Sequence, residues 1–131
     1  MGISFTIYEE QAFFVSTWIG NITDSDLLSS YKDLYENEKF KPGFHEIADL
    51  RKAQLNDVTS DGMSLLVEMM QRYLTEKCDD FKTAVIAPDN ISFGMSRVYK
   101  SMSYNSPENV EVFRELNEAL KWISIDESFL K

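Results

Sequence analysis

The sequence predicts an α/β fold in which a mainly parallel sheet carries helices. A short apolar run, Ala84–Ala87, is followed at once by Pro88 and a helical pattern, so a buried strand leads directly into a helix. Two strand-like segments near the N-terminus, joined by a short polar connection, predict an antiparallel hairpin. After this hairpin, strand and helix patterns alternate with short connections, which favours parallel strands joined by right-handed crossovers.

The first half of the chain contains the hairpin, a helix and a third strand. Ile3–Tyr8 alternates apolar and polar residues, and Ala12–Ile19 is rich in aromatic and β-branched residues. Thr23–Glu38 has one apolar face and begins with a threonine, a favourable N-cap, followed by acidic residues that suit the helix dipole. Lys41-Pro42-Gly43 ends this helix, and His45–Leu50 is the next strand.

The second half repeats the alternation. Thr59 or Ser60 caps a helix at Ser60–Lys77 that buries a face rich in Met and Leu. After the strand Thr83–Ala87, Asp89 or Asn90 caps the next helix. The remaining expected elements are that helix at Ile91–Met102, a one-turn helix start at Ser106-Pro107-Glu108, a strand at Val110–Phe113 and a closing helix at Glu115–Ile123.

Composition narrows the class of protein. The chain has 131 residues, which suits a single domain over 1–131, and its hydrophobic content of 44% is enough for a core. A formal net charge of −9 disfavours nucleic acid and anionic membrane surfaces as partners. We expect no membrane insertion and a cytoplasmic location, because no apolar run is long enough to span a bilayer, no secretion signal is visible, and the one cysteine, Cys78, suits a reducing compartment.

Four stretches together resemble a known family. They are Phe40-Lys41-Pro42-Gly43; Ala48-Asp49-Leu50-Arg51; Ala84–Pro88 running into Phe93–Tyr99; and Val112-Phe113-Arg114 with Ala119–Ile123. In this order the chain resembles the SpoIIAA-like (STAS/SEC14-type) family of small, mostly uncharacterised bacterial proteins. The resemblance implies a sheet with helices on it and no known catalytic activity. Relatives of this fold act as anti-sigma-factor antagonists, transporter domains or lipid-binding modules, and fold does not choose among these.

Ser60 is a candidate phosphorylation site through this resemblance. Anti-sigma-factor antagonists carry an Asp-Ser-Ser-Gly stretch whose first serine is phosphorylated, and the matching stretch here is Thr59-Ser60-Asp61-Gly62. A helix N-terminus favours a phosphate, but the adjacent Asp61 opposes it. The alternative, which we favour, is that Ser60 is simply a helix cap.

Asp49 and Arg97 are the leading candidates for a ligand site at the carboxyl ends of the strands. Arg97 would hold an anionic ligand there, with Arg51, Asp89 and Phe93 as further candidate ligand-binding residues. The alternative, which we favour, is an internal ion pair between Asp49 and Arg97. We expect Phe93, with its neighbour Gly94, to pack where helix and sheet approach closely.

No pattern predicts catalysis, a metal or a cofactor. His45 is the only histidine and lacks a second His or Cys nearby, so we interpret it as structural or exposed. Cys78 lies beside two aspartates, which disfavour a reactive thiolate. No acid pair stands out as a general acid and base. We therefore expect a protein without catalytic residues, metal or cofactor.

An aromatic and Met-rich set is expected to form the core. It consists of Phe13, Phe14, Trp18, Tyr31, Tyr35, Met69, Met70 and Trp122. By analogy with SEC14-type relatives, a small pocket between helices and sheet is the alternative for part of this set.

Two functions remain open from the sequence. We favour a non-enzymatic cytosolic regulatory or interaction module, whose partner is another protein or a second copy of the chain. The alternative is a protein that binds a small apolar or carboxylate-bearing ligand in a pocket near the carboxyl ends of the parallel strands. A homodimer is expected if the helices cover only one face of the sheet, because the other face would then need a partner.

Overall fold

The computed structural model describes residues 2–74 and 80–130, and within them five strands form one sheet in the order β1-β2-β3-β4-β5. β1 pairs antiparallel with β2, and every other neighbouring pair is parallel. The strands are β1 (Gly2–Tyr8), β2 (Phe13–Asn21), β3 (His45–Gln54), β4 (Phe81–Ile86) and β5 (Glu108–Phe113). The helices are α1 (Asp24–Tyr35), α2 (Ser60–Leu74), α3 (Asn90–Met102), α4 (Leu116–Ile123) and the short 3₁₀ helix η1 (Glu127–Leu130).

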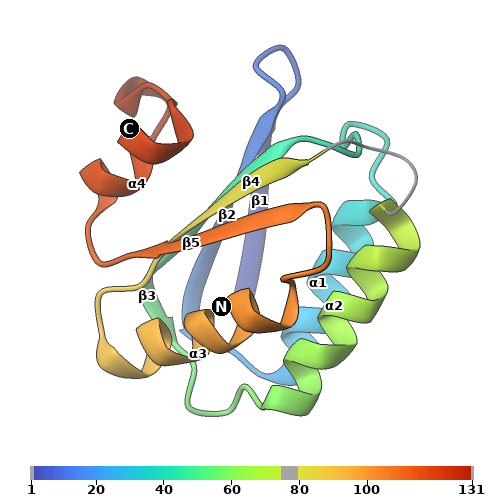
Figure 1. Ribbon diagram of the computed structural model, residues 1–131, viewed down its shortest axis with the longest axis vertical. Helices are drawn as coiled ribbons and strands as arrows, with labels where there is room; N and C mark the ends of the chain where they lie inside the picture. The colour runs from blue at the N-terminus through green and yellow to red at the C-terminus, as the bar shows by residue number, and fades with distance from the viewer. Residues whose placement is uncertain (1, 75–79, 131) are drawn as a thin grey trace.

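Helices cover both faces of the sheet. α1, α2 and α3 lie together on one face, whereas α4 lies on the opposite side (Figure 1). The parallel strands follow one another in chain order, so right-handed crossovers place all three connecting helices on the same side. The chain then passes from β5 to α4, which packs against β4 and β5 from the other side.

Strand alternation divides the core into two clusters. The larger cluster, between the sheet and α1–α3, contains Phe14, Trp18 and Val85. The smaller cluster, beneath α4 and η1, contains residues one position away, such as Phe13 and Ile86. The continuous apolar runs of β2 and β4 are therefore explained by burial on both faces.

The predicted fold class is confirmed, and two helix starts are as expected. Thr23 forms a capping box with Asp26 at the start of α1, and the Asp89 side chain accepts a hydrogen bond from the Ser92 amide at the start of α3. At α2 the cap is Thr59, whose hydroxyl accepts from the Gly62 amide, and not Ser60. The end of the expected helix Ser60–Lys77 lies outside the described residues.

Several strand boundaries differ from expectation, and two of them matter for the site. β3 continues to Gln54, because its polar second half still pairs with β2. Ser106-Pro107-Glu108 does not begin a helix: the turn ends at Pro107, and Glu108 is the first residue of β5. The Pro-Glu pair is typical of a helix start, but here Glu108 pairs with Phe81 at the beginning of β4. This difference matters because Glu108 is buried.

The second face of the sheet gives no reason to expect a dimer. α4 and η1 cover its apolar residues, including Phe13 and Val15. The part that these helices leave open is mainly polar, with Ser4 and Thr6 exposed on β1. The premise that helices cover only one face is therefore wrong, and the dimer expected from it loses that support.

Candidate functional site

A row of buried polar residues crosses the sheet face that α1–α3 cover. β2, β3, β4 and β5 each contribute one member, and each is at most 7% exposed. In strand order they are Ser16, Glu46, Thr83 and Glu108. Carboxylates are almost never buried to this degree without a partner, so this row is unusual within a core.

Glu46 is held through only one of its carboxyl oxygens. Oε2 accepts hydrogen bonds from the Ser16 hydroxyl at 2.7 Å and from the Tyr31 hydroxyl at 2.5 Å. Trp18 Nε1 in turn donates to Ser16 Oγ at 3.0 Å and fixes its position. Oε1 of Glu46 has no hydrogen-bond partner among the described residues.

Glu108 has a similar arrangement on the other side of β4. Its Oε2 accepts from the Thr83 hydroxyl at 2.6 Å, and its Oε1 accepts from the Tyr99 hydroxyl at 2.5 Å. Each glutamate therefore pairs with one sheet hydroxyl and one helix tyrosine. Short O–H···O contacts of this kind are typical of charge-assisted hydrogen bonds.

Burial changes the acidity of both glutamates. Desolvation, followed by the negative charge of Glu108, raises the pKa of Glu46 to about 7, although hydrogen bonds from Tyr31 and Ser16 oppose the shift. Desolvation likewise raises the pKa of Glu108. Burial and the nearby glutamates raise the pKa of Tyr31 and Tyr99 well above the ordinary value, so both stay protonated donors.

A cavity of about 60 Å³ lies between this polar row and the three helices. It contains room for about four to six water molecules. Its lining has no Lys, Arg or His among the described residues. The lining residues are Trp18, Leu27, Tyr31, Tyr35, Glu46, Ala48, Leu50, Leu55, Val58, Met63, Leu66, Thr83, Val85, Met95, Ser96, Tyr99 and Glu108.

Two further hydroxyls at the cavity are unpaired. Ser96 is 6% exposed, and Tyr35 is half-buried with its pKa raised well above the ordinary value by burial and then by the charges of Glu108 and Glu46. Within the described chain neither side chain has a hydrogen-bond partner, yet both line the cavity. Buried hydroxyls normally find partners, so these groups are available to a ligand or to water.

The cavity has a polar and an apolar end. Glu46 and Glu108 lie near the starts of β3 and β5, whereas Leu50 lies further along β3 and Leu55 and Val58 follow that strand. The polar end is therefore at the amino-terminal side of the parallel strands. The sequence predicts a pocket near the carboxyl ends of the parallel strands, and only the apolar end of this cavity lies there.

The expected pair between Asp49 and Arg97 is wrong. Asp49 accepts two hydrogen bonds from the Arg51 guanidinium, both at 2.9 Å. Burial acts to raise the pKa of Asp49, but hydrogen bonds from Arg51 outweigh it and lower the pKa. Strand alternation explains the error: Ala48 faces the helices, so Asp49 points to the opposite face from α3, which carries Arg97.

The other candidates on α3 lie outside the cavity. Arg97 is exposed, and Asp89 is the exposed cap of the helix. Phe93 is half-buried, with the Arg114 guanidinium 4.2 Å from its ring centroid. Gly94 is exposed, and a Cβ added there would meet nothing within 4 Å, so it does not mark a close approach of helix and sheet.

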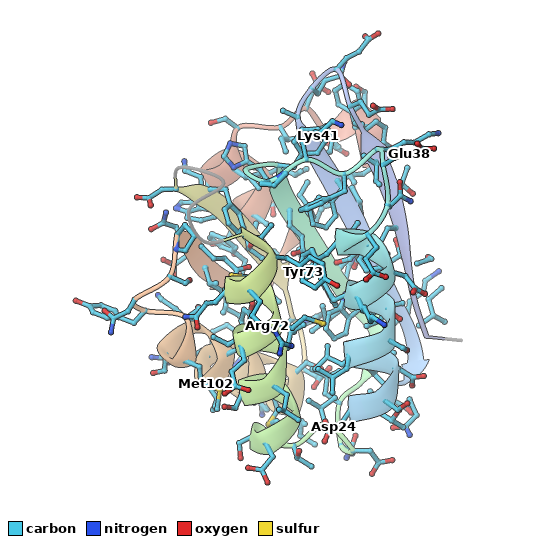
Figure 2. The ribbon with its side chains drawn as sticks, turned by 90° about the vertical axis from the view of Figure 1, so that its right-hand side faces the viewer. Asp24, Glu38, Lys41, Arg72, Tyr73 and Met102 are labelled. Atoms are coloured by element: carbon cyan, nitrogen blue, oxygen red, sulfur yellow. The ribbon has the colours of Figure 1, made fainter. Side chains whose placement is uncertain are left out.

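Ser60 is the exposed first residue of α2, and the carboxylate of Asp24 already lies at the N-terminus of that helix. Asp24, from the start of α1, accepts hydrogen bonds from both the amide and the hydroxyl of Thr59, at 2.9 Å and 2.5 Å. Figure 2 shows Asp24 at the end where the two helices begin. Further along, the Tyr73 hydroxyl links α2 to Glu36 at the end of α1 at 2.7 Å. Phosphorylation of Ser60 stays a prediction.

The remaining candidates have structural surroundings. His45 is half-buried and its Nδ1 accepts from the Lys82 amide at 2.9 Å, while burial and then the Lys82 charge lower its pKa. Cys78 lies outside the described residues. No group of three His, Cys, Asp or Glu side chains suited to a metal occurs in the described part of the chain. Of its helices, none is long and apolar enough to cross a membrane.

Sequence reasoning missed the two glutamates that define the site. A glutamate in a strand is usually exposed, so neither Glu46 nor Glu108 is a candidate from the pattern alone. The available signal lies on the helices: Tyr31 and Tyr99 occupy apolar helix faces, and a buried tyrosine hydroxyl usually has a hydrogen-bond partner.

A comparison with solved structures supports the fold. A crystal structure of an uncharacterised DUF3478-family protein from Shewanella loihica PV-4, described as having a SpoIIAA-like fold, matches with a TM-score of 0.59. The match covers 93% of this chain and 94% of that chain, at 16% sequence identity. The fold is SpoIIAA-like. No family model matches the chain, and the comparison with curated proteins found no match.

Proposed function

We propose that this protein binds a small molecule in the cavity between the sheet and α1–α3. The observation that carries the proposal is the unpaired Oε1 of Glu46, a residue only 5% exposed, at a cavity that the Ser96 hydroxyl also lines. Neither atom is sealed within protein, so both can form a hydrogen bond with a ligand that enters the cavity. The leucine-lined end suits an apolar portion of the same molecule.

The proposed activity is binding rather than catalysis. The lining includes no Cys or His among the described residues, so it offers neither a thiol nucleophile nor an imidazole base. The two glutamates disfavour a carboxylate-bearing ligand at this place, since two buried acids and a third would repel one another. The binding protein is proposed to be cytoplasmic.

A regulatory or interaction module is the second proposal. On α3, Ile91 and Val98 are 51% and 40% exposed and lie seven residues apart, on one helix face. Such residues favour contact with another protein or a second copy. Light scattering of the wild type and of Ile91→Ser/Val98→Ser at micromolar concentration tests self-association: a larger mass for the wild type alone supports a dimer, and equal monomeric masses oppose it.

A thermal-shift screen tests the binding proposal. The panel contains amines, alcohols, amides and carboxylic acids of up to about eight non-hydrogen atoms, the size that suits a small pocket. At least one class should raise the melting temperature of the wild type. Ala48→Leu should abolish that increase, because Ala48 lines the cavity and leucine would fill it.

Ala53→Leu is the matched control. Ala53 lies on the same strand and in the same core cluster but does not line the cavity, so this variant should keep the ligand response even if it is less stable. A panel in which no compound stabilises the wild type would contradict the proposed function. An equal response from Ala48→Leu would place the binding elsewhere.

A further inference from the structure

We infer that the cavity selects a protonated primary amine, a small alkylammonium ion whose N–H groups bind Glu46, with Glu108 alongside as the second buried acid. This inference rests on the proposed function and names its ligand class. Three features of the site support this inference. They are hydrogen-bond acceptors that lack protein donors, two buried acids that lack a protein cation, and an aromatic lining.

The first feature is an excess of acceptors. An ionised carboxylate only accepts hydrogen bonds, and Oε1 of Glu46 has none from the described residues. The hydroxyls of Ser96 and Tyr35 also face the cavity without partners and can each accept. A primary ammonium group has three N–H donors, which matches this set better than an alcohol with one or a carboxylate with none.

The second feature is uncompensated negative charge. Glu46 and Glu108 are 5% and 7% exposed, and both ion pairs found among the described residues lie elsewhere. Buried charges in proteins are normally paired. A ligand cation would provide the missing partner for one of them and allow it to ionise.

The third feature is the aromatic lining. Trp18, Tyr31, Tyr35 and Tyr99 all contribute to the cavity wall. Aromatic rings attract cations, and Trp and Tyr are the stronger of the common partners. Together with the leucine-lined end, this lining suits an ammonium group attached to a short alkyl chain.

Cavity size limits the chain length. A volume of about 60 Å³ corresponds to about four to six water molecules, so a ligand of five non-hydrogen atoms is a suitable probe. n-Butylamine meets this limit. 1-Butanol has the same size without the charge, and butanoate reverses the charge.

Proton release provides a test on the wild type. The titratable groups that face Glu46 are Glu108 from β5, Tyr31 and Tyr35 from α1, and Tyr99 from α3; α2 contributes only the apolar Met63 and Leu66 to the cavity. A bound ammonium ion favours the ionised form of Glu46, so at pH 6, where free Glu46 is still protonated, the protein should release a proton on binding. The alkylamine stays protonated across this range, so affinity should rise between pH 6 and pH 8.

Calorimetry of the wild type and Glu46→Gln with these three compounds at pH 8 tests the inference. For the wild type, n-butylamine should bind about tenfold or more tightly than 1-butanol, because charge-assisted hydrogen bonds are roughly twice as strong as neutral ones. Glu46→Gln should remove this preference. Glu111→Gln is the matched control, because Glu111 pairs with Lys100 outside the cavity and its loss should leave the preference intact.

The outcomes separate the inference from the proposed function. Equal or tighter binding of 1-butanol, or n-butylamine binding that does not strengthen from pH 6 to pH 8, overturns the amine inference while the cavity remains a binding site. If butanoate binds most tightly of the three compounds, the amine inference is likewise overturned while the cavity remains a binding site. If Glu46→Gln does not fold, the heat of n-butylamine binding to the wild type at pH 6, in two buffers of different ionisation enthalpy, still reports whether a proton is released, and no release at pH 6 overturns the inference.

Discussion

Glu46 and Glu108 lie on either side of β4 on the same buried face of the sheet, and neither has a cationic partner among the described residues. Burial and then the charge of Glu108 raise the pKa of Glu46 to about 7. The folded protein therefore holds the Glu46 proton more tightly than the unfolded chain does. Because of this difference in proton binding, both the free energy of unfolding and the affinity for the proposed ligand should depend on pH.

The first prediction concerns pH. Below about pH 4.5 both states bind the Glu46 proton, and between there and pH 7 only the folded state keeps it, so rising pH removes stability across this window. The loss should be on the order of 2–4 kcal/mol for a shift of this size. Urea unfolding at pH 5 and pH 8 should show Glu46→Gln gaining about this amount relative to the wild type.

The comparison with Glu46→Gln is needed because His45 acts in the opposite sense. Burial and then Lys82 lower the pKa of His45, so stability linked to His45 rises as pH increases toward its ordinary value. Both proteins contain His45, so the difference between them isolates Glu46. A difference that stays constant from pH 5 to pH 8 would contradict the raised pKa.

The second prediction concerns Tyr31, whose hydroxyl donates a 2.5 Å hydrogen bond to Glu46. Tyr31→Phe should lower the free energy of unfolding by about 1.5–3 kcal/mol at pH 8, where Glu46 is more ionised, and by about 1 kcal/mol at pH 5. Tyr104→Phe is the control, since Tyr104 is 86% exposed and should change stability by less than about 0.5 kcal/mol. Equal effects of Tyr31→Phe at both pH values would argue against a charged acceptor.

The third prediction contrasts two helical glycines. A Cβ on Gly62 would lie 2.2 Å from Asp24 Cγ, so Gly62→Ala should displace Asp24 from Thr59 and lower stability by about 1–2 kcal/mol. Gly94→Ala has open space and should raise stability by about 0.5–1 kcal/mol. Thermal unfolding of both variants checks the opposite signs, and a stabilising Gly62→Ala would contradict the contact with Asp24.

The fourth prediction follows from the corrected ion pair. Arg97→Ala should leave the urea midpoint unchanged, because Arg97 is exposed and forms no ion pair with the described residues. Arg51→Ala should lower stability by at most about 1 kcal/mol, since the pair with Asp49 is partly solvated and screened. A larger effect of Arg97→Ala than of Arg51→Ala would reverse this assignment.

The fold was accessible from sequence because its determinants are local. The alternation in β1 and the caps at Thr23 and Asp89 are set by nearby residues, and the structure contains each of them. Asp49 is a residue that local sequence patterns do not place correctly. Asp49 lies in the middle of β3 rather than near its end, because pairing with β2 extends the strand to Gln54. The face that Asp49 occupies depends on which side the helices cover, and the crossovers set that side.

The site was not accessible because it depends on contacts distant in sequence. Glu46 is buried by Tyr31 from another element, and Glu108 by Tyr99 and Thr83. Nothing within a few residues of either glutamate distinguishes it from an exposed strand residue. The proposed pocket between helices and sheet came only from analogy, and the structure places Trp18 at it.

Methyl NMR spectroscopy tests the central claim, a ligand site at this cavity, most directly. On titration with n-butylamine at pH 8, the methyl signals of Ala48, Met63 and Met95, which line the cavity, should shift together and saturate. Those of Ala84 and Ala119, which lie in the core cluster beneath α4, should stay in place. Shifts confined to surface methyl groups, or none at the three cavity residues at any n-butylamine concentration that leaves the protein folded, would contradict the account.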